Sequence, residues 1–341
     1  MDSMSNVTSF EIFYPRSATI FASVSAVLFT IIGVAGNLVT VLALLRCSKL
    51  RQHATTAFVV SLCVSDLMFC SINLPLIAAR YIYEEWIFGD TMCMLFPFFL
   101  YGNVAVSLLS MVAITINRYI LIACHSLYDR LYTKRYIFLM ILFAWLFSFS
   151  MMIPPLVGAW GQLGLDPPTF SCTILRKDGA SPKKFFFIFG FLLPCLVIIV
   201  SYSCIYWKAG NGCVTSPQQQ LQRREDIRLT RMMLTIFCCF LVCFCPLMVV
   251  NVAHDSIQQP IIHVLASILA WASSVINPII YAFSNRQYRQ AYRTLICGRP
   301  TQQRTSATQS RSGSGKTFIT EMLQFNAATE KVKITKNNCN A

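Results

Sequence analysis

Charge is what this sequence has least of. Only 12% of its 341 residues are Asp, Glu, Lys or Arg, about half of the roughly 25% typical of soluble domains. Because 55% of the residues are apolar and the mean hydropathy is +0.57, the chain cannot be disordered throughout, nor can its charges cover a soluble globule. Acidic residues are scarcer than basic ones, with 14 Asp and Glu against 28 Lys and Arg, so the net charge is +14. The composition indicates a membrane protein.

Signatures of catalysis are also missing. The four histidines (His53, His125, His254 and His263) fall at loops or ends of apolar runs and form no cluster with acids. No Cys-x-x-Cys pair recurs with His at zinc spacing, and no His-Glu-x-x-His or Gly-x-Ser-x-Gly motif is present. Residues 312–317 imitate half of a P-loop, but Ser310 stands where the first glycine is needed. We therefore expect no enzymatic activity.

Seven apolar runs are present, and each is long enough to cross ~30 Å of hydrocarbon at ~20 residues per crossing. We expect α-helices, because a lipid-exposed backbone must satisfy its own hydrogen bonds. The runs cover residues 19–45, 55–79, 91–123, 136–157, 185–207, 229–253 and 261–284. The prediction is an all-α membrane protein with an extracellular N-terminus (1–18), a seven-helix domain (19–297) and a disordered cytoplasmic tail (298–341).

The loops predict the orientation. With the N-terminus outside, 22 of the 28 Lys and Arg lie on the cytoplasmic side, as the positive-inside rule requires. The basic excess is then topological and calls for no nucleic-acid partner. We expect a multi-pass plasma-membrane protein whose first span acts as a signal anchor. Asn6, in the one Asn-x-Ser/Thr sequon, is a predicted glycosylation site.

Cysteine placement supports the same topology. Of 15 cysteines, only Cys93 and Cys172 face outward. Two such cysteines in an oxidising compartment should form a disulfide, with two free thiols as the alternative. The remaining cysteines within the spans are expected to pack rather than to bind a metal.

One polar or proline landmark occurs in every span. They are Gly36-Asn37, Asp66, Asn117-Arg118-Tyr119, Trp145, Pro194 with Tyr202, Pro246, and Asn277-Pro278-Ile279-Ile280-Tyr281. In this order they resemble the rhodopsin-like (class A) G-protein-coupled receptors over roughly residues 20–297. The resemblance implies a receptor for an extracellular ligand that activates a heterotrimeric G protein. It also implies arrestin and receptor kinases at the tail, and surrounding membrane lipids.

A sodium site is implied at Asp66, whose family counterpart binds a sodium ion with polar groups of the third and seventh spans. Asn103 and Ser107 are four residues apart on the third span, and Ser273 and Asn277 on the seventh, so each pair shares a helix face. All offer oxygen atoms, as a hard cation requires. The alternative is a hydrogen-bonded polar cluster without an ion. No other cofactor is expected.

The resemblance assigns Arg118 to holding the inner helix ends together and engaging the G protein. The family has Asp or Glu before this arginine and Tyr119 corresponds to the residue after it, but here Asn117 replaces the acid. Asp226 lies twenty residues before Pro246, about 30 Å along a helix. The family's inter-helix ionic latch uses an acid at this height, so the resemblance implies an Arg118–Asp226 pair in the resting state, with a solvated interfacial arginine as the alternative.

Activation is expected to use bends and aromatic side chains. Pro246 and Pro278 each remove a backbone hydrogen bond and permit a kink. Phe244 stands where the family usually has a tryptophan toggle. Tyr202 and Tyr281 are implied to swing inward and bridge through water.

The outer pocket predicts a ligand class. Leu100 stands where aminergic receptors have an aspartate, and Trp271 where opsins have a lysine, so a monoamine and retinal are both disfavoured. The expected lining is Leu100, Tyr101, Phe186, Phe191, Leu247, Met248 and Trp271, and the rim offers Arg80, Arg176, Lys177, Lys183, His254 and His263. This favours an anionic amphiphile, such as a fatty acid or lysophospholipid. Arg176 is the expected head-group contact, whereas Lys183 and Lys184 are expected to be solvated; a peptide ligand is the alternative.

Cations and apolar residues alternate after the seventh span, over residues 286–296. This pattern predicts a short amphipathic helix on the inner leaflet. Cys297 is then a palmitoylation candidate, with a free thiol as the alternative.

Two other functions are the alternatives to a G-protein-coupled receptor. A transporter or channel predicts inverted repeats, which the sequence does not show, and a scavenging receptor would lack G-protein coupling.

Overall fold

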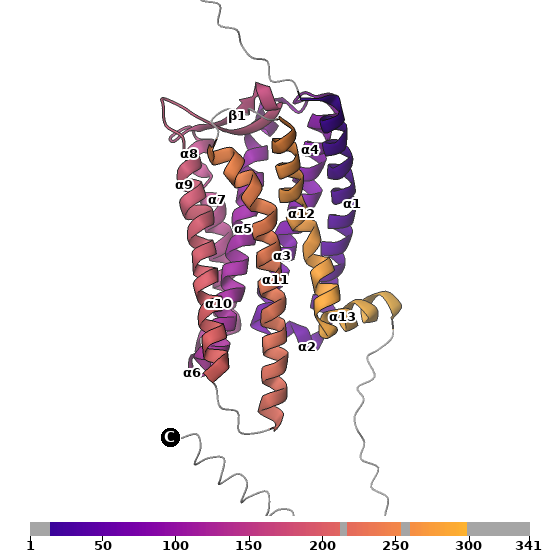
Figure 1. Ribbon diagram of the computed structural model, residues 1–341, viewed down its shortest axis with the longest axis vertical. Coiled ribbons are helices and arrows are strands. Elements are labelled where there is room, and N and C mark those ends of the chain that lie inside the picture. The colour runs from indigo at the N-terminus through magenta and orange to yellow at the C-terminus, as the bar shows by residue number, and fades with distance from the viewer. Residues whose placement is uncertain (1–13, 212–216, 254–259, 299–341) are drawn as a thin grey trace, which may run out of the picture.

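The computed structural model describes residues 14–211, 217–253 and 260–298. Seven helical segments of this part are long and apolar enough to cross a membrane, and they stand side by side in one bundle (Figure 1). Asn6, His254 and the tail from residue 299 lie outside the described residues. The predicted seven-helix architecture is confirmed.

Six spans agree with the hydropathy prediction to within a few residues, whereas the helix of the sixth begins at Pro217, twelve residues before the predicted start at residue 229. Two of the spans contain π-helical turns that were not predicted. The second span is α3 (Ala54–Met68), η1 (Phe69–Asn73) and α4 (Leu74–Tyr83), and the fifth is α9 (Lys183–Phe187), η3 (Ile188–Leu192) and α10 (Leu193–Asn211). The others are α1 (Arg16–Arg46), α5 (Gly89–Ala123), α7 (Lys134–Ser150) with α8 (Ile153–Leu156), α11 (Pro217–Ala253) and α12 (Pro260–Ser284).

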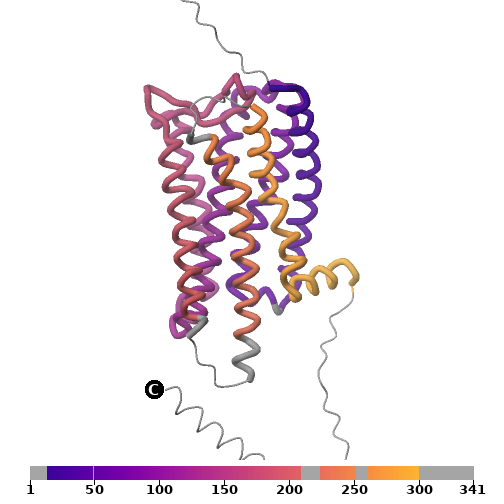
Figure 2. The backbone as a smooth tube through the Cα atoms, viewed as in Figure 1, coloured from indigo at the N-terminus to yellow at the C-terminus, as the bar shows by residue number. Residues whose placement is uncertain are grey.

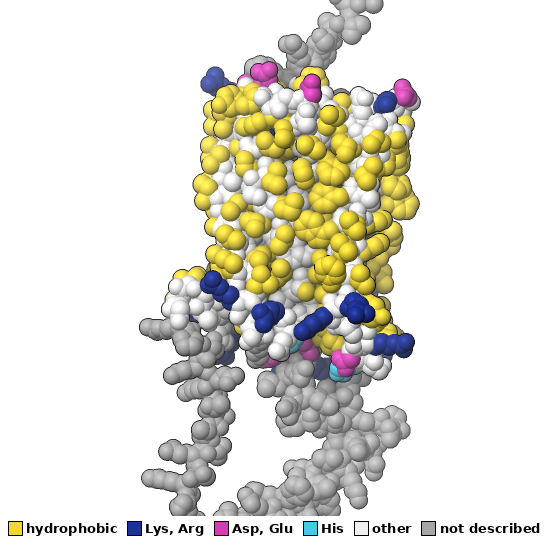
Figure 3. All heavy atoms as spheres, turned by 180° about the vertical axis from the view of Figure 1, so that it is seen from behind, with side chains coloured by type: hydrophobic (Ala, Val, Ile, Leu, Met, Phe, Trp, Pro, Cys, Tyr) yellow, Lys and Arg dark blue, Asp and Glu magenta, His cyan; other side chains and the backbone are white. Residues whose placement is uncertain are grey.

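The outside of the bundle is apolar around its middle. Figure 3 shows hydrophobic side chains over the sides and a band of Lys and Arg at the inner end. Large apolar side chains such as Phe143 and Phe283 are 65% and 78% exposed. In water such exposure would be costly, so this surface fits a lipid environment.

Small residues let the helices approach closely. A Cβ atom at Gly102 of α5 would meet the ring of Phe149 of α7 at 2.6 Å, and one at Gly36 of α1 would meet Pro278 of α12 at 3.1 Å. In lipid, helices associate through such close packing because the tails are as apolar as the side chains. These contacts fix the positions of the spans that carry the polar landmarks.

A β-hairpin that the sequence analysis did not foresee covers the outer end (Figure 1). Strand β1 (Gln162–Asp166) pairs antiparallel with β2 (Ser171–Leu175) through the 3-10 turn η2 (Pro167–Thr169). Leu163 and Ile174 face each other and are buried. The predicted disulfide is confirmed, since Cys172 of β2 is bonded to Cys93 of α5. The hairpin is thereby tied to the third span.

The inner end holds the short helices α2 (Ser48–Arg51) and α6 (His125–Leu131) and the longer α13 (Arg286–Cys297). Helix α13 runs across the bundle direction (Figure 2). The Asn285 side chain caps it by accepting a hydrogen bond from the Gln287 amide at 2.8 Å, and Gly298, with φ of 63°, follows its last residue. Tyr288 is buried and Ile296 is 73% exposed. This is the amphipathic helix predicted after the seventh span.

Candidate functional site

The inner site is built around Arg118, near the end of α5. Its side chain is 2% exposed, and Nη1 lies 3.5 Å from Asp226 Oδ1 of α11, which is partly exposed. Helix α11 is continuous from Pro217, so it carries Asp226 to the level of Arg118. The structure thus brings together the two residues expected to pair.

Thr55, which the sequence analysis missed, bridges Arg118 to its neighbour. The Arg118 Nη2 group donates a hydrogen bond to Thr55 Oγ1, and Thr55 Oγ1 donates to Asn117 Oδ1 at 2.7 Å. The Asn117 amide also donates to the Tyr128 hydroxyl of α6 at 3.4 Å. A threonine at the start of a span is common, so only the fold reveals this role. Tyr119, the next residue, packs partly buried against the core.

Two buried tyrosine hydroxyls lie near this site. Those of Tyr202 and Tyr281 have no hydrogen-bond partner among the described residues. Tyr281 of α12 stacks on Tyr288 of α13, with ring centroids 5.4 Å apart. The Phe244 ring stacks on the ring of Phe240, which lies one turn earlier on α11, with the ring centroids 4.5 Å apart. Pro246 and Pro278 lie within α11 and α12, close to these aromatic pairs in sequence.

Asp66 lies at the middle of the bundle and is 2% exposed. Its Oδ2 accepts from the Asn277 amide at 2.7 Å and its Oδ1 from Ser107 at 3.4 Å. Asn103 and Ser273 line the same cavity of about 10 Å³, and Asn103 has no hydrogen-bond partner for either side-chain atom among the described residues. All five expected residues therefore meet around one small space. That space holds about one water-sized group, and the carboxylate, hydroxyl and amide oxygens suit a hard monovalent cation.

A cavity of about 300 Å³ opens beneath the hairpin. It is lined by both strands, by outer residues of several spans and by five of the predicted aromatic and apolar residues: Leu100, Tyr101, Leu247, Met248 and Trp271. His263 lines it too. Tyr14 lies above His263, with its hydroxyl 3.4 Å from Nδ1. Burial raises the pKa of the Tyr14 hydroxyl, so it remains a neutral hydrogen-bonding group at this edge.

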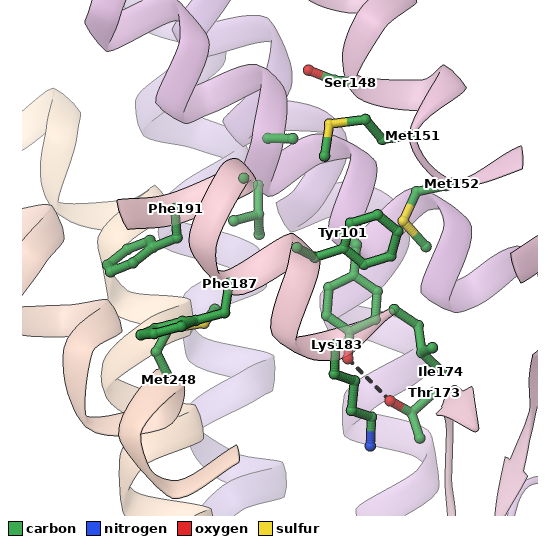
Figure 4. Close-up of a pocket in the computed structure, with 14 residues that line it drawn as sticks. Tyr101, Ser148, Met151, Met152, Thr173, Ile174, Lys183, Phe187, Phe191 and Met248 are labelled. Atoms are coloured by element: carbon green, nitrogen blue, oxygen red, sulfur yellow. Dashed lines mark hydrogen bonds between the residues drawn. The ribbon is translucent and has the colours of Figure 1, made fainter. Parts of the chain in front are cut away.

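A second cavity of about 130 Å³ adjoins the first and is called the side cavity here. It lies among α5, α7, η3 and the hairpin, and Figure 4 shows Phe187, Phe191, Met151 and Met152 around it. Phe186 lines it as well. Tyr101 and Lys183 line both cavities. The wall of the side cavity is mostly apolar, with polar groups from Tyr101, Ser148, Thr173 and Lys183.

The placement of the pocket cations differs from the expectation. Arg176, the expected head-group contact, lines neither cavity, and its side chain is exposed. The reason is the hairpin, because β2 ends at Leu175 and Arg176 lies beyond it. Lys183, expected to be solvated, is exposed and also lines both cavities, and Arg80 lines the larger one.

Comparison with known proteins defines the class. Residues 36–281 match the family model of the 7 transmembrane receptor (rhodopsin family), and the chain belongs to this family of G-protein-coupled receptors. It is therefore a multi-pass receptor of the plasma membrane, in a class that is not enzymatic.

Individual relatives are similar over most of the chain. Protein trapped in endoderm-1 of Drosophila melanogaster is 56% identical, over 82% of this chain and 78% of that protein. The G-protein coupled receptor moody of the same fly is 36% identical over 84% of this chain, which spans about half (52%) of moody's length. Human melatonin receptor type 1B is 30% identical, over 83% of this chain and 80% of the relative.

The structural comparison concerns the fold. The crystal structure of squid rhodopsin matches with a TM-score of 0.75 at 24% identity, covering 92% of this chain and 99% of that one. The bundle is thus the rhodopsin fold.

Proposed function

We propose that this receptor binds a ligand in its outer cavity and, in response, activates a heterotrimeric G protein at its inner end. The observation that carries the proposal is the ion pair of 3.5 Å between buried Arg118 and Asp226, which joins the third span to the sixth. Opening this pair frees a buried arginine at the cytoplasmic face and lets α11 move outward. A ligand that favours the open state raises its population, because binding to one of two states shifts the equilibrium towards it.

The orientation follows from charge. The N-terminus is extracellular in this proposal, because the basic band of Figure 3 then faces the cytoplasm. With this orientation we also propose glycosylation at Asn6, palmitoylation at Cys297, and binding of arrestin and receptor kinases to the tail. Cys297 is exposed at the end of α13, where an acyl chain can reach the inner leaflet. A transporter has less support, given the family.

Sodium is the proposed allosteric ion. Asp66, Asn103, Ser107, Ser273 and Asn277 would hold it, because their oxygen atoms surround one small buried cavity. The ion would supply a positive charge beside a buried carboxylate that has only amide and hydroxyl partners in the described structure. It would stabilise the packing of the second, third and seventh spans.

An anionic lipid is the proposed ligand. Leu100 and Trp271 line the outer cavity, at positions where a carboxylate or a lysine would be needed for a monoamine or for retinal. Most of the lining side chains are apolar or aromatic, and the charged ones are two cations, Arg80 and Lys183, and one acid, Asp166, which accepts a hydrogen bond from Thr169. An amphiphile with one negative group satisfies both features.

Nucleotide exchange tests the proposed coupling. Purified receptor in nanodiscs is mixed with a panel of heterotrimeric G proteins, beside Arg118→Ala, Asp226→Ala and, as a control, Arg228→Ala. Arg228 is an exposed cation two residues from Asp226. We expect Arg118→Ala to abolish exchange, Asp226→Ala to raise basal exchange severalfold and Arg228→Ala to leave it near wild type. Wild-type receptor that stimulates no G protein, with or without a library of lipid acids, would contradict the proposal.

A further inference from the structure

A buried arginine stands at the wall of the outer cavity. Arg80 of α4 is 6% exposed and lines the cavity. Its Nη1 donates to the Thr169 carbonyl oxygen at 3.0 Å, and its Nη2 to the Tyr81 hydroxyl at 3.2 Å. Its guanidinium carbon lies 4.3 Å from the centroid of the Tyr81 ring. The side chain is therefore held in place beneath the hairpin.

None of these partners carries a full negative charge. In the described part of the chain no carboxylate lies within 4.0 Å of Arg80, and its buried Nε has no acceptor. The acids nearby in sequence or in the cavity wall have other partners, since Asp166 accepts from Thr169 Oγ1 at 2.7 Å and Glu84 from Thr19 at 2.8 Å. A buried charge is costly unless it is paired, so this arginine is suited to an anion supplied by the ligand.

The side cavity offers the complementary half of such a ligand site. It shares Tyr101, Val104, Thr173, Lys183 and Met248 with the outer cavity, so the two spaces meet along these residues. Beyond the junction its wall is formed mainly by phenylalanine and methionine side chains, together with Ile174 and Ser148 (Figure 4). Lys183 is the one cation in this lining, and the Tyr101 hydroxyl there is paired with Thr173 at 3.0 Å.

We propose that Arg80 and the side cavity form the two ends of one site for a single-chain anionic amphiphile. The carboxylate or phosphate binds the Arg80 guanidinium, and the chain passes Tyr101 and Lys183 to end among Phe187, Phe191 and Met151. The proposal rests on the lipid ligand proposed above, and it assigns the charge recognition to Arg80 in place of Arg176. Arginine suits this role because its planar donors can grip a carboxylate or phosphate with two hydrogen bonds.

The head-group half is tested by equilibrium binding to receptor in nanodiscs, with binding to empty nanodiscs subtracted. The probes are tritiated saturated fatty acids of 8 to 16 carbons, alkyl phosphates of the same lengths, and the matching fatty alcohols. We expect Arg80→Gln to weaken acid or phosphate binding about tenfold or more, and to leave alcohol binding unchanged. Arg80→Lys should fall between the two, and the exposed control Arg176→Gln should stay within about twofold of wild type.

The chain half is tested by filling the side cavity from Gly190 of η3. A Cβ atom at Gly190 would meet only Met151, at 3.7 Å, so Gly190→Leu fits the backbone and projects into the cavity. We expect this variant to bind the longest acids about tenfold more weakly and the shortest within about twofold. Phe189→Leu, at the neighbouring lipid-exposed position, is the control and should leave the chain-length profile as in wild type.

Three results would overturn the inference. The wild-type receptor could bind none of the acids or phosphates, it could bind acids no better than alcohols, or Arg80→Gln could leave the affinity for acids unchanged.

Controls separate a folding defect from a lost contact. The unfolding temperature of each variant is measured without ligand, and Arg80→Lys keeps the charge if Arg80→Gln unfolds. G-protein coupling is judged separately, because basal exchange that depends on Arg118 would stand even if the lipid site failed. Whether acids or phosphates bind more tightly identifies the head group.

Discussion

Asn117 changes how Arg118 beside it is held. Where the family has an adjacent carboxylate, this chain has an amide whose oxygen accepts from Thr55, and Thr55 in turn accepts from Arg118. The guanidinium therefore has one charged partner, Asp226, together with a neutral hydroxyl bridge. A neutral hydrogen bond is weaker than a charge-assisted one, so the resting state is held mainly across α5 and α11.

Introducing the family's carboxylate at position 117 should lower the basal activity of the receptor. Asn117→Asp places a negative charge directly beside Arg118, so we expect basal nucleotide exchange to fall severalfold. The substitution is nearly isosteric and changes one charge. The measurement is basal exchange on the G protein that the wild type stimulates best. Asn117→Ala serves as the comparison, since it removes the amide without adding charge. Exchange that rises in Asn117→Asp would show that Arg118 is held by other groups.

Removing the hydroxyl bridge should have the opposite effect. Thr55→Val keeps the shape of the side chain but deletes the group that links Asn117 to Arg118. We expect basal exchange to rise by about tenfold or more, because Arg118 then depends on Asp226 alone and a lost hydrogen bond to a charged group costs about 1.5–3 kcal/mol. The neighbouring Thr56→Val, also at a buried position, is the matched control. Equal changes in both variants would point to a packing effect instead.

Single residues differ in how readily the sequence reveals them. Arg118 and Asp226 could be named as a pair because the family resemblance supplied the latch, and helix spacing placed Asp226 at the height of Arg118. Thr55 could not be named, because its role depends on which span lies beside α5. The position of Arg176 outside both cavities could not be foreseen either, because it depends on where β2 ends and no helical period fixes that point.

Helix contacts made by glycine give a test at the scale of the elements. Gly102 of α5 lies against the Phe149 ring of α7, where an added Cβ would be 2.6 Å from a ring atom. We expect Gly102→Val to destabilise the bundle by about 1–3 kcal/mol, because the ring and the fourth span must move to admit the side chain. Thermal unfolding in nanodiscs measures this as a lower midpoint. Gly190→Ala, where the nearest atom is 3.7 Å away, should leave the midpoint unchanged, and an equal midpoint for both variants would contradict the packing argument.

Among the elements, the membrane spans and α13 were predicted from the sequence, whereas the π-helical turns and the hairpin were not. The spans and the amphipathic α13 follow from composition and period, since burial in lipid demands apolar helices of sufficient length. The π-helical turns η1 and η3 were not predicted, although each ends two residues before a proline, Pro75 and Pro194. Proline lacks an N–H group and so interrupts the regular hydrogen bonding of a helix, but it does not by itself specify a π-helical turn. The hairpin β1–β2 is short and includes Gly164 and a Pro-Pro turn, so neither strand has a strong alternating signal.

At the scale of the whole molecule, three sites lie along one axis of the bundle. The outer cavity and the cavity around Asp66 share Phe69, Val104 and Phe244 in their walls. Phe244 lies on the same helix as Asp226, and Asn277 lies on the same helix as Tyr281. A change in the outer cavity can therefore shift α11 and α12 as rigid elements. Coupling of this kind requires that each site prefer one of the two states.

Sodium provides the test of that coupling across the molecule. The polar groups around Asp66 converge in the state where Arg118 and Asp226 are paired, so an ion bound there stabilises this state by mass action. We expect added sodium chloride to lower basal nucleotide exchange in wild type more than choline chloride at equal ionic strength, which controls for screening. Asp66→Asn removes the carboxylate while keeping its size, and should abolish the difference between the two salts. By reciprocity, sodium should also weaken binding of any ligand that activates the receptor, and by the same factor as that ligand weakens sodium binding. Equal responses to the two salts in wild type would show that the polar cluster works without an ion.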